Sequence, residues 1–188
     1  MVKSKRGGKR VAQSDLYRRK TKEEVIKEIE DKTRKDSTET ASVIDENGSV
    51  ILEKSEGLGS EVNFTYDELA KMVDKTLTHN HPKGRTFSPE DVSLAFSTCL
   101  REVRASHVNG CYSLTRTFNI GDSIPTVYTT FAIDYEKATS DYKANTVDAI
   151  FDQTEDADMC NKLIDDFRRK WLKDNAMKYG WVYKEESL

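Results

Sequence analysis

The sequence predicts an α+β fold for this chain of 188 residues, and three observations carry the prediction. Two Asn-Gly pairs, Asn47-Gly48 and Asn109-Gly110, lie between runs suited to strands, and Asn-Gly is the pair that type I′ hairpin turns prefer. A Ser or Thr followed by acidic residues marks helix starts at Thr21, Thr65 and Ser88. In the last third of the chain, apolar residues recur at helical spacing.

The first part of the chain contains a polar tail, one helix and one hairpin. Residues 1–20 are rich in Gly, Lys and Arg, so we expect a disordered basic tail. A short helix follows over about residues 22–33, because apolar residues there recur on one face. Strands are expected over residues 38–45 and 49–54, joined by the first Asn-Gly turn.

The middle of the chain alternates short helices and strands. The helix that opens at Thr65 leads into a short strand over residues 75–78. A second helix runs from Ser88 to about Cys99. Strands over residues 100–107 and 111–118 then form the second hairpin.

The C-terminal part is predicted to be mostly helical. One polar helix covers about residues 134–150, and an amphipathic helix covers about 156–178. The apolar stripe of the second helix is interpreted as core packing; its members are Met159, Leu163, Phe167, Trp171 and Leu172. Trp181-Val182-Tyr183 forms a short final strand. We therefore expect a core over residues 21–120 and a helical C-terminal extension over 121–188 that packs on it.

The charge is unevenly distributed along the chain. Residues 1–20 carry eight Lys or Arg and one Asp, a net charge of +7, whereas the remainder carries −10. A basic tail on an acidic body suggests an arm that contacts nucleic acid or an acidic partner surface. A tail that is merely solvated is the alternative, and the acidic body argues against broad nucleic-acid binding by the core.

Compartment and redox chemistry follow from what the sequence lacks. No apolar run is long enough to span a membrane, and the N-terminus lacks the apolar region of a secretory signal. We therefore expect a cytoplasmic protein, in a host cytoplasm or a virion assembled there, with no membrane partner. Cys99, Cys111 and Cys160 are far apart and form no Cys-x-x-Cys pair, so they are interpreted as small buried residues.

The strongest chemical signal is the stretch from Thr78 to Asp91. His79 and His81 are one residue apart, so on an extended strand both imidazoles point to the same side. Asp91 follows ten positions after His81. Two imidazoles and a carboxylate are the three protein ligands of a catalytic zinc site, which keeps its fourth position for water. The alternative is that Asp91 only completes a capping box with Ser88 and that the histidines are ordinary loop residues.

Glu39 is a further candidate. On the predicted strand it shares a face with Ala41 and Val43, which should point to the core. A carboxylate on that face is costly to bury without a partner. It therefore points toward the histidines across the sheet, or it lies at a strand end in solvent.

These residues together resemble the JAB/MPN (JAMM) metallohydrolase superfamily, including its RadC-like bacterial branch. The signature there is an upstream Glu, then His-x-His-Pro, then Ser-x-x-Asp, which here are Glu39, His79 to Pro82 and Ser88 to Asp91. The interval between His81 and Asp91 is one residue shorter than in that signature. Within the superfamily, Thr78 to Pro82 followed by Phe87 to Asp91 is most similar to domains of phage head-morphogenesis proteins.

The resemblance implies a fold, a cofactor and an activity. The fold is a JAB/MPN-like, cytidine-deaminase-like mixed β-sheet flanked by helices. His79, His81 and Asp91 would hold Zn²⁺, Glu39 would accept and return a proton, and Ser88 would hydrogen-bond the developing oxyanion. The reaction would be hydrolysis of a peptide or isopeptide bond in a protein or peptide substrate, with phage head proteins as further partners. Glu53 and Glu61 are weaker alternatives to Glu39 as the upstream acid.

Two other classes of function stay open. In the first, the protein is a nuclease in which His79 or His81 acts as base and Lys83 or Arg85 binds phosphate. In the second, it is a non-catalytic JAB-fold module that binds a capsid or packaging partner through the basic tail. Activity on nucleic acid that survives a chelator would favour the first, and loss of salt-sensitive binding on deletion of residues 1–20 would support a role for the tail.

Overall fold

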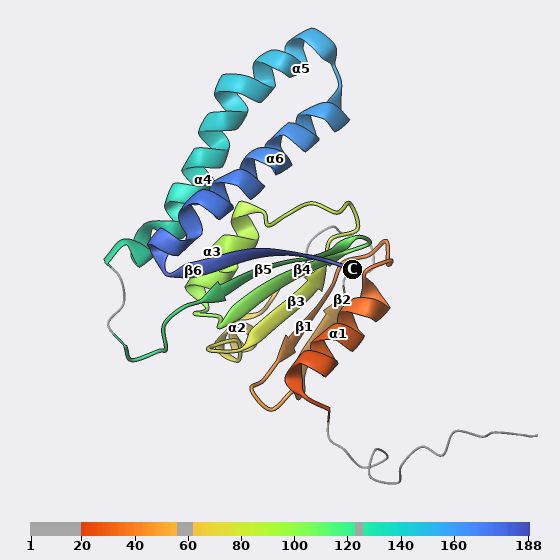
Figure 1. Ribbon diagram of the computed structural model, residues 1–188, viewed down its shortest axis with the longest axis vertical. Helices are drawn as coiled ribbons and strands as arrows, with labels where there is room; N and C mark the ends of the chain where they lie inside the picture. The colour runs from red at the N-terminus through yellow and green to blue at the C-terminus, as the bar shows by residue number, and fades with distance from the viewer. Residues whose placement is uncertain (1–19, 56–61, 123–125) are drawn as a thin grey trace, which may run out of the picture.

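The computed structural model describes residues 20–55, 62–122 and 126–188, and its fold is α+β (Figure 1). The predicted fold class is thus confirmed as a six-stranded mixed sheet flanked by helices, with a largely helical C-terminal part. The expected tail lies outside the described residues except for Lys20. The strands are β1 (Thr40–Ile44), β2 (Val50–Ser55), β3 (Thr76–Asn80), β4 (Glu102–His107), β5 (Gly110–Arg116) and β6 (Trp181–Ser187).

The sheet has the order β2-β1-β3-β4-β5-β6. β3 and β4 are parallel, and the other neighbouring pairs are antiparallel. A parallel pair needs a crossover connection, and here the chain between β3 and β4 forms a helix. The helices are α1 (Lys22–Thr33), α2 (Tyr66–Ala70), α3 (Pro89–Ser97), α4 (Phe131–Tyr142), α5 (Asp148–Thr154) and α6 (Ala157–Asn175).

The three predicted helix starts are confirmed, and each has the same local cause. Thr21, Thr65 and Ser88 are the N-caps of α1, α2 and α3, and each forms a complete capping box with the acid three positions later. The side-chain oxygen accepts from the backbone N–H of that acid, whose carboxylate accepts from the backbone N–H of the cap. Both donors would otherwise lack a helical partner.

The two hairpins lie where the sequence predicts, but their turns are not type I′. Gly48 has a φ of +77°, whereas Asn47 is absent from the described residues with positive φ. A type I′ turn requires positive φ at both central residues. In the second hairpin His107 pairs with Gly110, so the loop consists of Val108 and Asn109.

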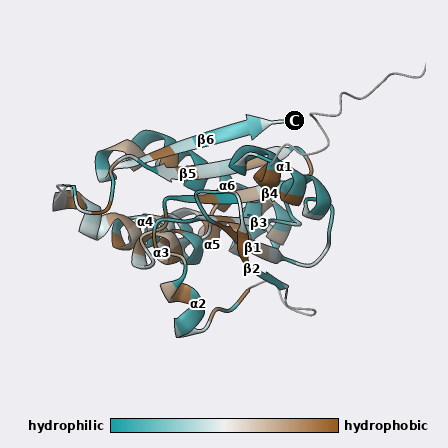
Figure 2. Ribbon diagram, turned by 90° about the horizontal axis from the view of Figure 1, so that it is seen from below, coloured by the Kyte–Doolittle hydropathy of each residue, from teal (hydrophilic) through white to brown (hydrophobic). Residues whose placement is uncertain are grey.

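The hydrophobic core lies on the sheet face that packs against α3 and the base of α4 and α6. Val43, Leu77, Val103 and Leu114 from four successive strands are all almost completely buried there. Figure 2 shows hydrophobic colouring on β1, whereas the edge strand β6 is largely hydrophilic. The core therefore lies between α3 and the sheet face that includes β3, the strand that carries His79.

The opposite face of the sheet is polar and is covered partly by α1. Glu30 of α1 is only 4% exposed, and its carboxylate accepts from Arg104 Nε at 2.6 Å and from Thr78 Oγ1 at 3.1 Å. Arg104 also pairs with Glu102 at 3.1 Å and with Glu186 at 2.9 Å. A half-buried guanidinium thus has three carboxylate partners, which ties α1 to β4 and β6.

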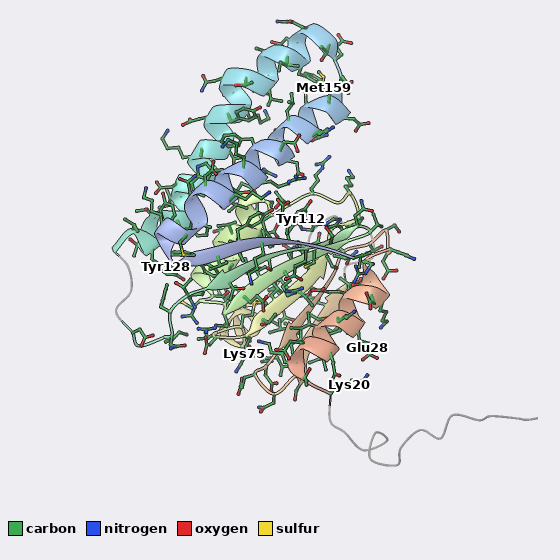
Figure 3. The ribbon with its side chains drawn as sticks, viewed as in Figure 1. Lys20, Glu28, Lys75, Tyr112, Tyr128 and Met159 are labelled. Carbon is green, nitrogen blue, oxygen red and sulfur yellow. The ribbon has the colours of Figure 1, made fainter. Side chains whose placement is uncertain are left out.

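The C-terminal part is a helical hairpin followed by a strand. α4 and α6 run side by side and extend away from the sheet, with Met159 near the outer end (Figure 3). The single helix expected over 134–150 is instead α4, a π-helical segment (Lys143–Val147) and α5. β6 then returns along β5, so the extension contributes a strand to the sheet.

The expected core stripe of α6 is only partly core. Leu172 is fully buried in the main core, but Phe167 stacks on Tyr142 within the hairpin, with ring centroids 4.2 Å apart. Along the described ranges, none of the helices combines the length and apolar character required to cross a bilayer.

Candidate metal centre

His79 is placed by the alternation of side chains along β3. Thr78 contacts Glu30 under α1, so His79 points to the other face, toward α3. Its neighbours across the sheet are Ala41 on β1 and Ala105 on β4. Two alanines leave space around an imidazole that is only 4% exposed.

His81 is oriented by its own loop. Its Nδ1 lies 2.6 Å from the carbonyl oxygen of Arg85. A carbonyl only accepts, so Nδ1 carries the hydrogen and the neutral ring presents a lone pair at Nε2. Burial, together with the positive charge of His79, lowers the pKa of His81 to about 4. At neutral pH, His81 therefore offers an unprotonated nitrogen to the site.

The two histidines converge on Asp91. The Nε2 atoms of His79 and His81 are 2.8 Å apart. Asp91 Oδ1 lies 3.3 Å from Nε2 of His79, and Oδ2 lies 3.6 Å from Nε2 of His81. The shorter interval between His81 and Asp91 therefore does not prevent the aspartate from reaching both imidazoles.

Asp91 also completes the capping box of α3. Its Oδ2 accepts from the backbone N–H of Ser88 at 2.7 Å, and Ser88 Oγ accepts from the backbone N–H of Asp91 at 3.1 Å. The two interpretations of Asp91 from the sequence are therefore compatible, because a carboxylate has enough lone pairs for both. The cap fixes where the carboxylate stands relative to the histidines.

Glu39 reaches the site from the segment just before β1. Its Oε1 lies 4.0 Å from Nε2 of His79. Ligand atoms of Glu39, His79 and His81 all lie within 4.8 Å of one another, and this group could hold a metal ion. Glu39 is half-buried and points toward the histidines, as the first interpretation of this acid had it.

The charges in the site are strongly coupled. Burial opposes the protonation of His79, but the carboxylates of Asp91, Glu39 and Glu30 outweigh it and raise the pKa of His79. Burial likewise opposes ionisation of Asp91, but His79 and His81 hold its pKa well below the usual range. The cluster of carboxylates therefore attracts positive charge to the space between the rings, which a proton or a cation can supply.

The loop between His81 and Asp91 is held from outside by side chains that the sequence did not reveal. Tyr135 of α4 donates to the carbonyl oxygen of Phe87 at 2.7 Å, and Asp165 of α6 accepts from the backbone N–H of Thr86 at 2.6 Å. Burial raises the pKa of Tyr135 well above its ordinary value, so this hydroxyl stays a donor. These partners lie 48 and 79 residues away in sequence, where no local pattern could indicate them.

Other candidates lie elsewhere or outside the described residues. His107 ends β4, stacks on Tyr112 and accepts from the backbone N–H of Asn109 at 3.3 Å, as expected of a strand-end histidine. Glu53 on β2 is exposed, and Glu61 lies outside the described residues. Lys83 is exposed on the loop.

The donor set fits a zinc ion. Two imidazole nitrogens with carboxylate oxygens are ligands that zinc commonly takes in catalytic sites, and the Nε2 atoms already converge. Among the described residues, no group hydrogen-bonds the buried Nδ1 of His79. The comparisons with known protein families, with curated proteins and with solved structures found no match for this chain.

Proposed function

We propose that this protein is a zinc-dependent hydrolase of peptide or isopeptide bonds, of the JAB/MPN type. The observation that carries the proposal is the convergence of Glu39, His79, His81 and Asp91 from three separate segments. These are the residues on which the sequence resemblance rests. Association with a phage is part of the proposal, and its support is the likeness of residues 78–91 to phage head-morphogenesis proteins.

His79, His81 and Asp91 hold the ion in this proposal. Bound zinc supplies Lewis-acid activation of water and of the scissile carbonyl. Glu39 lies close to the histidine nitrogens, and in this proposal it acts as the base that accepts a proton from water. It then returns that proton to the leaving amine.

Ser88 is held next to the proposed ligand Asp91 by the hydrogen bonds of the capping box. Its oxygen already accepts the backbone N–H of Asp91, which leaves its own hydrogen to donate. A hydroxyl donor at this position is suited to the oxyanion that forms as the amide carbonyl is attacked. Ser88 thus has a structural role at the cap and a chemical role in the reaction.

Zinc content and amide hydrolysis test the proposal together. Protein purified without chelator should contain about one zinc ion per chain. Glu39→Gln should keep zinc at saturating concentration and lose hydrolysis, whereas His79→Ala should lose both. His107→Ala is the matched control, because it removes a histidine that lies outside the cluster.

The substrates to use are a peptide library and peptides branched through a lysine side-chain amide. Hydrolysis that stops on chelation and returns with zinc supports the proposal. Protein that neither contains zinc nor takes it up would contradict it. Cleavage of RNA or DNA that continues in chelator would favour the nuclease instead.

A further inference from the structure

Asn80 lies between the two histidines but points away from them. It is completely buried on the face of the sheet that α1 covers. Its side chain reaches the segment between α1 and β1, which is the segment that carries Glu39. The residue that separates the imidazoles therefore contacts the backbone that carries the proposed base.

The three hydrogen bonds of the Asn80 side-chain amide all go to this segment. Its Oδ1 accepts from the backbone N–H of Thr40 at 2.7 Å. Its Nδ2 donates to the carbonyl of Thr38 at 3.1 Å and to that of Asp36 at 3.3 Å. Two of the three bonds are made to the residues immediately before and after Glu39.

The position of Asn80 explains why a side chain connects β3 to the segment before β1. The ladder between β1 and β3 ends at the pair Ala41 and His79. One residue further along, the Asn80 amide bonds to the backbone N–H of Thr40, so a side chain continues the connection where the strand pairing has ended. The chain can then leave the sheet at Glu39 without losing its attachment to β3.

We propose that Asn80 is a positioning residue that holds the Glu39 carboxylate against the metal centre. The inference rests on the proposed function, because it assumes that an ion binds between the histidines. Asn80 itself faces the other side of the sheet, so any effect that it has on the ion is transmitted through Glu39. Substitution of such a residue should change the affinity of the site for zinc while leaving the proposed ligands themselves unchanged.

A double-mutant cycle with zinc as the probe tests this dependence. Glu39→Gln should weaken zinc binding several-fold, because it removes a negative charge near the ion. Asn80→Ala should weaken it by a similar factor in the wild-type background and have little further effect when combined with Glu39→Gln. A purely structural role would weaken binding equally in both backgrounds, and that result would overturn the inference.

Thr78→Val is the matched control. Thr78 lies on the same strand and the same face, is 1% exposed, and donates a buried hydrogen bond to Glu30 instead of to the Glu39 segment. It should lower the melting temperature without changing the zinc dissociation constant. Asn80→Asp serves as a second variant if Asn80→Ala does not fold, because it keeps the acceptor for Thr40 but cannot donate to the two carbonyls.

The outcomes separate the two proposals. Wild-type protein that binds no zinc would remove the proposed function and this inference with it. Wild-type protein that binds zinc, with additive effects of the Asn80 and Glu39 substitutions, would remove the inference alone. Non-additive effects, with an unchanged dissociation constant for Thr78→Val, would support it.

Discussion

Replacing Tyr135 by Phe should show that the C-terminal helices hold the loop of the candidate metal centre. The Tyr135 side chain is completely buried, and its hydroxyl donates to the carbonyl oxygen of Phe87 at 2.7 Å. Tyr135→Phe keeps the ring and removes only this hydrogen bond. The carbonyl of Phe87, which precedes the cap of α3, then loses its donor in a buried place.

The expected loss of stability follows from that single bond. A buried acceptor left without a donor costs about 1–3 kcal/mol, so we expect a decrease of about 2 kcal/mol in the free energy of unfolding. For a chain of this length, each kcal/mol corresponds to about 2–4 °C, so the melting temperature should fall by about 4–8 °C. Thermal melting followed by circular dichroism, and urea unfolding, measure both quantities.

The control is Tyr142→Phe on the same helix. Tyr142 stacks on Phe167, and its hydroxyl makes no hydrogen bond to any residue that the structure describes. It should change the free energy of unfolding by less than about 0.5 kcal/mol. Zinc affinity should fall with Tyr135→Phe and not with Tyr142→Phe, because only the first loosens the segment between His81 and Asp91. Equal behaviour of the two variants would refute the reasoning.

Two further predictions concern buried charge. Burial raises the pKa of the Asp165 carboxyl, although the carboxylate accepts a hydrogen bond from the backbone N–H of Thr86. The ionised form is therefore disfavoured in the folded state. As a result, the free energy of unfolding falls as pH rises above the unfolded pKa of about 3.9. Asp165→Asn keeps the acceptor, so its melting temperature relative to wild type should rise between pH 3.5 and pH 7, and a relative fall over that range would contradict this. Glu30→Ala removes the most buried of the three carboxylate partners of Arg104 and leaves buried donors without an acceptor, so it should cost about 1–3 kcal/mol in urea unfolding. Lys137→Ala breaks an exposed ion pair and should cost less than about 0.5 kcal/mol, and similar losses for these two variants would show that burial is not the cause.

The parts of the fold that the sequence predicts are those with a local cause. The caps at Thr21, Thr65 and Ser88 need only an acid three residues later, so the helix starts are visible in the sequence. Asn47-Gly48 located a hairpin correctly but suggested the wrong turn, because only Gly48 has positive φ. Hairpin position depends on the flanking strands, whereas turn type depends on how many residues the ladder leaves in the loop.

The candidate site is predicted less directly. The spacing of His79 and His81 places both imidazoles on one side, and that inference needs only the period of a strand. The approach of Glu39 depends on β1 pairing with β3, a long-range contact, and the sequence indicates it mainly through the family resemblance. The parallel pairing of β3 with β4 and the contacts of Tyr135 are set by tertiary packing, so no local pattern reports them.

The end of the β1–β3 ladder explains why the centre forms where it does. Within a ladder, facing side chains are separated by the fixed spacing of the strands. A carboxylate on a paired residue would therefore have to project straight out from the sheet, beside the imidazole. Beyond the pair Ala41 and His79, the chain before β1 is free to turn, and Glu39 can approach an imidazole from a direction that a strand residue cannot take. The turn takes Glu39 out of the β1–β3 ladder, and the Asn80 amide bonds to the backbone on either side of it. The opposite orientations of His79 and Asn80 allow this arrangement, since β3 presents an imidazole to the candidate metal centre on one face and, on the other, an amide that bonds to the backbone around Glu39.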